Sequence, residues 1–192
     1  MKKRNNNNWI FTISIILTAI VMAFLSFVPV SIEFIKPFIV YFDPTKLLSN
    51  LPLWIFINGI IALYSHSEKT ATLNTTLFNI VCFVSYCLFS IILTHTMPKE
   101  MFLTWIVFTL IWTIFSYLVW SANQSDSKRW ILSTLLLAIL FSTCFTYTEN
   151  TISNTTILNF LLYVFLVVIL YKGTKETLII VVSSIILAMI LN

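Results

Sequence analysis

Charged residues and glycine are both scarce in this sequence. Only 9% of its 192 residues are Asp, Glu, Lys or Arg, and glycine occurs only at Gly59 and Gly173. A soluble domain is roughly one-quarter charged, so this chain lacks the polar surface that would cover a water-soluble globule. Hydrophobic residues make up 59% of the chain. We therefore predict that a lipid bilayer surrounds most of the protein.

Sequence signatures of catalysis and metal binding are also missing. The chain contains no G-x-S-x-G, no H-E-x-x-H and no glycine-rich phosphate-binding loop. Its three cysteines form no C-x-x-C pair, and the expected topology places His66 and His95 on opposite sides of the membrane. No basic stripe indicates nucleic-acid binding. We predict no enzymatic activity, no metal site and no cofactor.

No charged side chain lies within the long apolar runs of the sequence. Charges inside a membrane are the usual mark of proton relays and ion paths, so their absence makes a proton-driven pump or a coupled transporter less favoured. The polar residues that do lie within the runs are neutral.

Long, continuous apolar runs predict helices rather than a β-barrel. In lipid every backbone amide needs a partner within the protein, and barrel strands would alternate apolar and polar residues. We predict one all-α domain over residues 1–192, a polytopic transmembrane helix bundle. Its seven predicted spans are 9–28, 47–64, 71–93, 101–120, 130–147, 157–171 and 177–191.

The first span, Trp9–Val28, sets the orientation of the chain. A run of about 20 apolar residues is long enough to cross roughly 30 Å of hydrocarbon. The basic residues Lys2, Lys3 and Arg4 precede it and predict that the N-terminus is cytoplasmic. The run exceeds the roughly 7–15 apolar residues of a signal peptide, so we expect it to remain as an anchor.

The second span, Leu47–Tyr64, is the weakest of the seven, and the number of crossings depends on it. With seven spans, the cytoplasmic side holds all basic residues except Lys36, Lys46 and Lys99. If Leu47–Tyr64 is re-entrant, six spans remain and most basic residues fall outside. The positive-inside rule favours seven spans. It predicts a multi-pass protein of the cell membrane with a cytoplasmic N-terminus and an extracytoplasmic C-terminus.

The segment 29–46 is apolar but cannot form a straight crossing. It contains three prolines together with Glu33, Lys36 and Asp43, and each internal proline removes a helix hydrogen bond. We predict an interfacial or re-entrant segment on the extracytoplasmic side. It serves either as an exposed ligand surface or as an amphipathic connector.

Asn58 and Asn79 are the candidate site residues within the spans. They lie at similar depths in the second and third spans, which a short turn joins. We predict a side-chain hydrogen bond between them, either as a contact between helices or as part of a ligand-binding site. Trp105 and Trp112 lie seven residues apart on one helix face and are expected to pack against neighbouring helices or lipid.

Ala19 and Ala23 form a small-x-x-x-small pair in the first span. Such a pair allows another helix to approach closely, so these residues are the candidate helix–helix contact and predict a membrane-protein partner. The pair is similar to one in the first helix of the substrate-binding subunits of energy-coupling-factor vitamin importers, where it docks on the shared coupling subunit. Those subunits have six helices and more glycine, so the resemblance is confined to this pair.

Three classes of function are compatible with these observations. The first is a small membrane protein with a non-catalytic binding, partner or accessory role in a membrane complex, and we favour it because short loops leave little room for catalytic machinery. The second is a transporter subunit that binds a neutral or lipophilic solute. The third is an immunity or envelope-stress protein.

Overall fold

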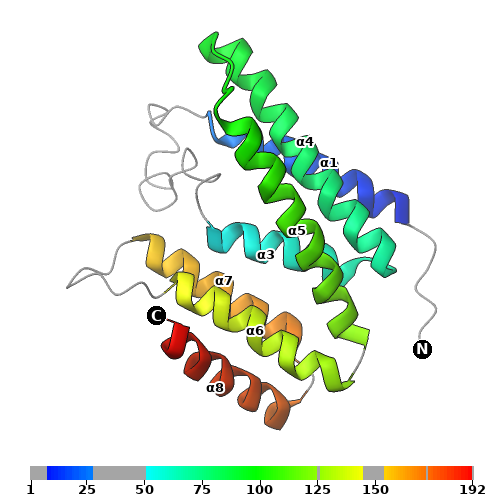
Figure 1. Ribbon diagram of the computed structural model, residues 1–192, viewed down its shortest axis with the longest axis vertical. Helices are drawn as coiled ribbons and strands as arrows, with labels where there is room; N and C mark the ends of the chain where they lie inside the picture. The colour runs from blue at the N-terminus through cyan, green and yellow to red at the C-terminus, as the bar shows by residue number, and fades with distance from the viewer. Residues whose placement is uncertain (1–7, 28–50, 125, 145–153, 172, 192) are drawn as a thin grey trace.

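The computed structural model describes residues 8–27, 51–124, 126–144, 154–171 and 173–191. Within these ranges the chain forms seven α-helices and no strand, so the predicted all-α fold is confirmed (Figure 1). The predicted segment 29–46 and the first residues of the second span lie outside the described residues. The helices are α1 (Asn8–Leu25), α3 (Leu51–Tyr64), α4 (Glu68–Thr94), α5 (Met101–Gln124), α6 (Asp126–Cys144), α7 (Asn154–Leu170) and α8 (Thr174–Leu191).

Successive helices run in opposite directions. In Figure 1 the start of α1 lies towards the right, and the facing ends of α3 and α4, of α5 and α6, and of α7 and α8 lie towards the same side. The remaining helix ends, including the end of α8, lie towards the left. The bundle therefore has two ends, and the first and last described helices begin at the same one.

The helix ends differ from the predicted spans by a few residues, for local reasons. α4 begins at Glu68 rather than Ala71, so the turn predicted over 65–70 is too long. Ser67 is the N-cap: its side chain accepts a hydrogen bond from the backbone N–H of Thr70, and the Thr70 side chain accepts one from the backbone N–H of Ser67. This capping box satisfies two N–H groups that the first turn leaves free. α4 ends at Thr94, and the C-cap residue His95 has a left-handed φ of 54°.

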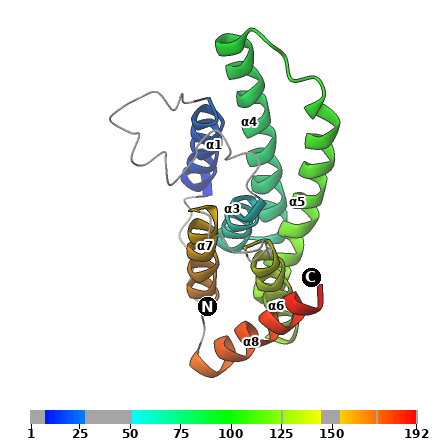
Figure 2. The ribbon, with the colours of Figure 1, turned by 90° about the vertical axis from the view of Figure 1, so that its left-hand side faces the viewer.

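The shortest helix, α3, lies at the centre of the bundle. It packs against α4, α5, α6 and α7, and Figures 1 and 2 show it between the α1–α4–α5 group and the α6–α7–α8 group. Its 14 residues begin at Leu51, with Pro52 in the first turn, where proline is tolerated because that N–H needs no helix partner. Burial on several sides explains why a helix only about 21 Å long is stable.

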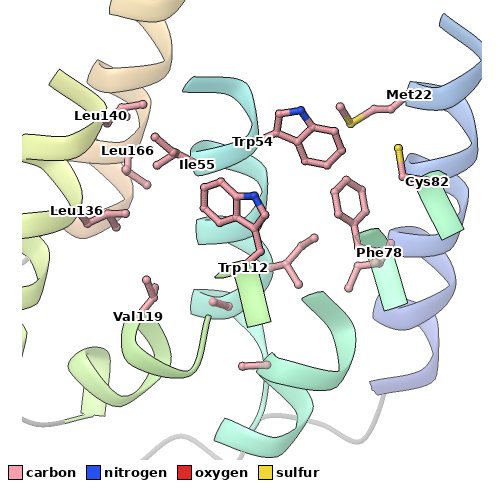
Figure 3. Close-up of a cluster of buried hydrophobic side chains, with 14 of the residues drawn as sticks. Met22, Trp54, Ile55, Phe78, Cys82, Trp112, Val119, Leu136, Leu140 and Leu166 are labelled. Atoms are coloured by element: carbon pink, nitrogen blue, oxygen red, sulfur yellow. The ribbon is translucent and has the colours of Figure 1, made fainter. Parts of the chain in front are cut away.

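Large aromatic side chains fill the space around α3. Trp54 makes edge contacts with Phe78 of α4 and with Trp105 and Phe108 of α5, at centroid distances of 5.8, 5.4 and 5.1 Å. Figure 3 shows Ile55 on the opposite side of α3, pointing towards residues of α6 and α7. α3 thus joins the two groups of helices through one continuous core.

The packing places small polar residues inside and large aliphatic residues outside. Asn58, Thr75, Asn79, Ser116 and Ser184 are fully buried. Two helices, α4 and α5, are long and apolar enough to cross a membrane, yet only 22% of the most apolar stretch of each is buried. A core helix of a soluble protein would be mostly buried. Most of the apolar surface of α4 and α5 therefore faces outward.

Candidate functional site

Asn58 and Asn79 are joined by the predicted hydrogen bond. The Asn79 Nδ2 donates to Asn58 Oδ1 at 3.1 Å, and both side chains are fully buried. Each Nδ2 also donates to a carbonyl one turn earlier in its own helix, to Trp54 O and Thr75 O, both at 2.9 Å. The predicted hydrogen bond is therefore confirmed. It forms because α3 and α4 are antiparallel and the short turn between them places the two amides at the same depth.

Two oxygen atoms beside this hydrogen bond have no hydrogen-bond partner among the described residues. They are Asn79 Oδ1 and Thr75 Oγ1, which lie one turn apart on α4 and are buried. A buried polar atom without a partner costs free energy, so these two oxygens lower the stability that the contact provides. The contact links α3 and α4, and whether it also binds a ligand stays a prediction.

We expect Asn58→Leu and Asn79→Leu to show coupled effects on stability. Either single change leaves one buried amide without its partner, whereas the double change removes both amides. The free energies of unfolding should therefore deviate from additivity by about 0.6 kcal/mol, and by no more than about 1.7 kcal/mol. Reversible unfolding of the purified protein in detergent measures this coupling.

The matched control pairs Asn58→Leu with Ser90→Ala. Ser90 lies 11 residues beyond Asn79 on α4, roughly 16 Å along the helix axis, and bonds to the carbonyl of Thr96 at 2.8 Å. These two changes should be additive because they share no partner. Additive effects for Asn58 and Asn79 as well would show that their hydrogen bond contributes nothing to stability.

A second set of polar contacts joins α1, α4, α5 and the turn after α3, near the end of the bundle at which α1 begins. Thr12 Oγ1 donates to Asn74 Oδ1 at 3.2 Å, and Asn74 Nδ2 donates to Ser65 Oγ at 3.3 Å. Trp120 Nε1 donates to Ser65 O at 3.1 Å. We call Thr12, Asn74 and Ser65 the polar cluster. Sequence reasoning missed it, although Asn74, one turn before Phe78 in an apolar run, was a usable signal.

Ala19 and Ala23 are fully buried in this structure. α1 packs mainly against α4, so the helix that approaches closely over these small residues belongs to the same chain. The outward side of α1 carries instead large apolar residues such as Ile13, Leu17 and Val21. A partner that bound the first span would therefore contact this outward side, not the alanine pair.

An apolar cavity of about 250 Å³ lies between α1, α3 and α4. Its innermost residues, Ile15, Ile61 and Phe78, are buried. The exposed residues Ser14 and Thr18 of α1 form its rim, so the cavity is reached from the outward surface of that helix. The lining is almost entirely apolar. Both rim hydroxyls donate to carbonyls of α1 itself. Neither Asn58 nor Asn79 lines this cavity.

The two tryptophans of α5 and the two histidines beside α4 are the remaining residues that the sequence analysis named. Trp105 and Trp112 are both buried. Trp105 contacts Trp54 of α3 at 5.4 Å and Phe83 of α4 at 5.2 Å, so its predicted packing against neighbouring helices is confirmed, whereas the ring contacts of Trp112 are with Phe108 and Phe115 of its own helix. His66 precedes α4 and His95 caps its far end. Because a helix of 27 residues is roughly 40 Å long, the two imidazoles cannot bind one metal ion within one chain.

Comparison with known proteins gives no match: no family model, no curated protein and no solved structure matches this chain. The similarity to the substrate-binding subunits of energy-coupling-factor importers thus stays limited to Ala19 and Ala23.

Proposed function

We propose that this protein is an integral membrane protein that crosses the bilayer seven times and has a non-catalytic binding or accessory role in a membrane complex. The observation that carries the proposal is the apolar outer surface of the bundle, which encloses neutral polar side chains. Large aliphatic side chains such as Leu73, Leu110 and Ile114 are exposed, whereas Asn58 and Asn79 are fully buried. An apolar surface of this extent would cause aggregation in water. In a bilayer the same apolar surface would be in contact with lipid chains.

The charges and the helix directions support a cytoplasmic N-terminus in this proposal. Successive helices alternate in direction (Figure 1), as seven consecutive crossings require. The end of the bundle at which α1 begins would then be cytoplasmic. In the sequence, most basic residues precede α1 or lie at the turns that join α3 to α4, α5 to α6 and α7 to α8, as the positive-inside rule expects. Tyr64, Trp130 and Tyr171 are exposed at this same end, and aromatic rings favour the membrane interface.

Reporter fusions after Asn192 are expected to place the C-terminus outside the cytoplasm. Alkaline phosphatase should be active at this position and green fluorescent protein should be dark, because seven crossings from a cytoplasmic start end on the opposite side. Fusions truncated after Ser67 or Gly173, at cytoplasmic turns, should give the reverse pattern. A fluorescent fusion after Asn192 would mean an even number of crossings and would contradict the proposed topology.

The accessory role is supported by a part of the bundle that has few neighbours. The end of α4 and the start of α5 extend beyond α6, α7 and α8 (Figures 1 and 2), and α7 and α8 do not pack against either helix to any extent. Among the described helices, α1 alone lies alongside this projecting part, with Phe24 in edge contact with Phe89 at 5.5 Å. The outward side of the projecting hairpin is the surface on which we expect a second membrane protein.

Site-specific photo-crosslinking in cells tests this surface. A photoreactive residue at Leu103, which is 72% exposed on the projecting part of α5, should give one discrete protein adduct. The matched control is Met189 of α8, which is 71% exposed and should give lipid adducts only. Lipid adducts alone at both positions would exclude a stable partner on the hairpin and would contradict the accessory role.

The cavity geometry favours the accessory role over a solute carrier. A carrier for a neutral solute would enclose the solute among polar side chains such as Asn58 and Asn79, whereas these line no part of the cavity between α1, α3 and α4. The volume of about 250 Å³ is below the roughly 300–1,000 Å³ of typical small-molecule sites. The cavity also opens on an outward helix face.

A further inference from the structure

The cavity between α1, α3 and α4 has the features of a site for a slim apolar group. Besides its innermost residues, Phe11, Ile57 and Ile60 form its sides, and each is half-buried. Apart from Ser14 and Thr18 at the rim, the lining is apolar, and apolar cavities bind apolar molecules, as an engineered cavity of about 150 Å³ in another protein binds benzene. A volume of about 250 Å³ holds a longer group of the same width.

One end of the cavity is closed by polar contacts. Thr12 is adjacent to Phe11, Asn74 lies one turn before Phe78, and Ser65 lies one turn after Ile61. These three residues form the hydrogen-bonded polar cluster, which joins the three helices that line the cavity. An apolar molecule therefore cannot pass through this end, and it has to enter sideways over the rim of α1.

The rim lies on a surface that is otherwise apolar. Ser14 and Thr18 are exposed on α1 between the large exposed residues Ile13, Leu17 and Val21. Because the hydroxyls of Ser14 and Thr18 already donate within the helix, at 2.9 and 2.8 Å, they present no free donor to an apolar molecule that crosses them. Because the side chains of Ser14 and Thr18 are small, they leave the cavity open at its rim.

We propose that this cavity binds one acyl chain of a bilayer phospholipid from the cytoplasmic leaflet. The inference rests on the proposed membrane location, which makes acyl chains the most concentrated apolar solute at the rim. The leaflet follows from position, since Phe11, Ser14 and Ile15 lie in the half of α1 that begins at the proposed cytoplasmic end. The polar cluster stops the chain at that end, so the tail enters from the side and points towards the middle of the bilayer.

Photoactivatable phospholipid tests the proposal in the intact protein. The protein is reconstituted in vesicles of phosphatidylglycerol that carries a diazirine in one acyl chain, and adducts are mapped by mass spectrometry. Wild-type protein should be labelled on Ile57, Ile60 or Ile61 at least as strongly as on the fully outward Leu110. In Ser14→Phe the added ring covers the rim, and labelling of the three isoleucines should fall about tenfold, the effect of losing one or two methylene contacts in an apolar pocket.

The matched control is Leu17→Phe, which adds the same ring to an exposed position of α1 outside the cavity and should leave labelling unchanged. Thr18→Phe, at the other rim residue, should repeat the effect of Ser14→Phe. Equal labelling of the three isoleucines in Ser14→Phe and wild type would overturn the proposal. So would labelling of the cavity by free diazirine fatty acid alone.

If the protein is not located in the membrane, the labelling experiment gives a different result. In that case Leu110 is not labelled either, and the protein does not float with the vesicles. Labelling of Leu110 without labelling of the isoleucines refutes the acyl-chain site while it leaves the proposed function standing.

Discussion

Trp54→Ala is expected to lower the free energy of unfolding by about 3–5 kcal/mol, the usual cost of deleting a fully buried large aromatic side chain. Trp54 is 1% exposed, and its ring contacts Phe78 on α4 and Trp105 and Phe108 on α5. The cost is high because α3 is short and cannot stay in place without this contact. Denaturant or thermal unfolding of the purified protein in detergent measures the change.

Trp9→Ala is the control for the loss of an indole side chain. Trp9 is 64% exposed, so its removal should change stability by less than about 0.5 kcal/mol. Trp54→Phe, which keeps an aromatic ring at the same place, should cost less than Trp54→Ala. If Trp54→Ala were as mild as Trp9→Ala, the aromatic contacts of Trp54 would not hold α3 against α4 and α5.

The fold class and the Asn58–Asn79 contact could both be predicted from the sequence. Long, continuously apolar runs predict helices, because the strands of a β-barrel would alternate apolar and polar residues. The contact could be predicted because the turn between the second and third spans is short, and a short turn fixes the depth of each residue relative to its neighbour. Local geometry was sufficient in both cases.

The inward face of each helix could not be predicted in the same way. In a soluble helix the apolar stripe marks the buried face, but in this chain both faces are apolar, as Ile15 and Leu17 show on opposite sides of α1. The central position of α3, the covering of Ala19 by α4 and the cavity all depend on which face of each helix is buried. Neutral polar residues were the better signal, since Asn74 and Asn79 both point inward.

Leu110→Asp is expected to prevent stable insertion of α5 into the membrane. Leu110 lies near the middle of α5 and is 59% exposed. In a bilayer its side chain would face hydrocarbon, and a carboxylate at the centre of a membrane helix costs about 2.5–3.5 kcal/mol on insertion scales. Full-length protein in the membrane fraction should fall strongly, as measured by flotation and immunoblotting after brief induction.

The control for this change is Met101→Asp at the first position of α5. An aspartate there lies at the expected interface and beside the positive end of the helix dipole, so insertion should be unaffected. The comparison also separates a membrane protein from a soluble one. In water an exposed Leu→Asp change costs less than about 0.5 kcal/mol and would improve solubility. Normal accumulation of Leu110→Asp in a soluble fraction would therefore mean that the outward surface of α5 faces water, and the proposed membrane location would be wrong.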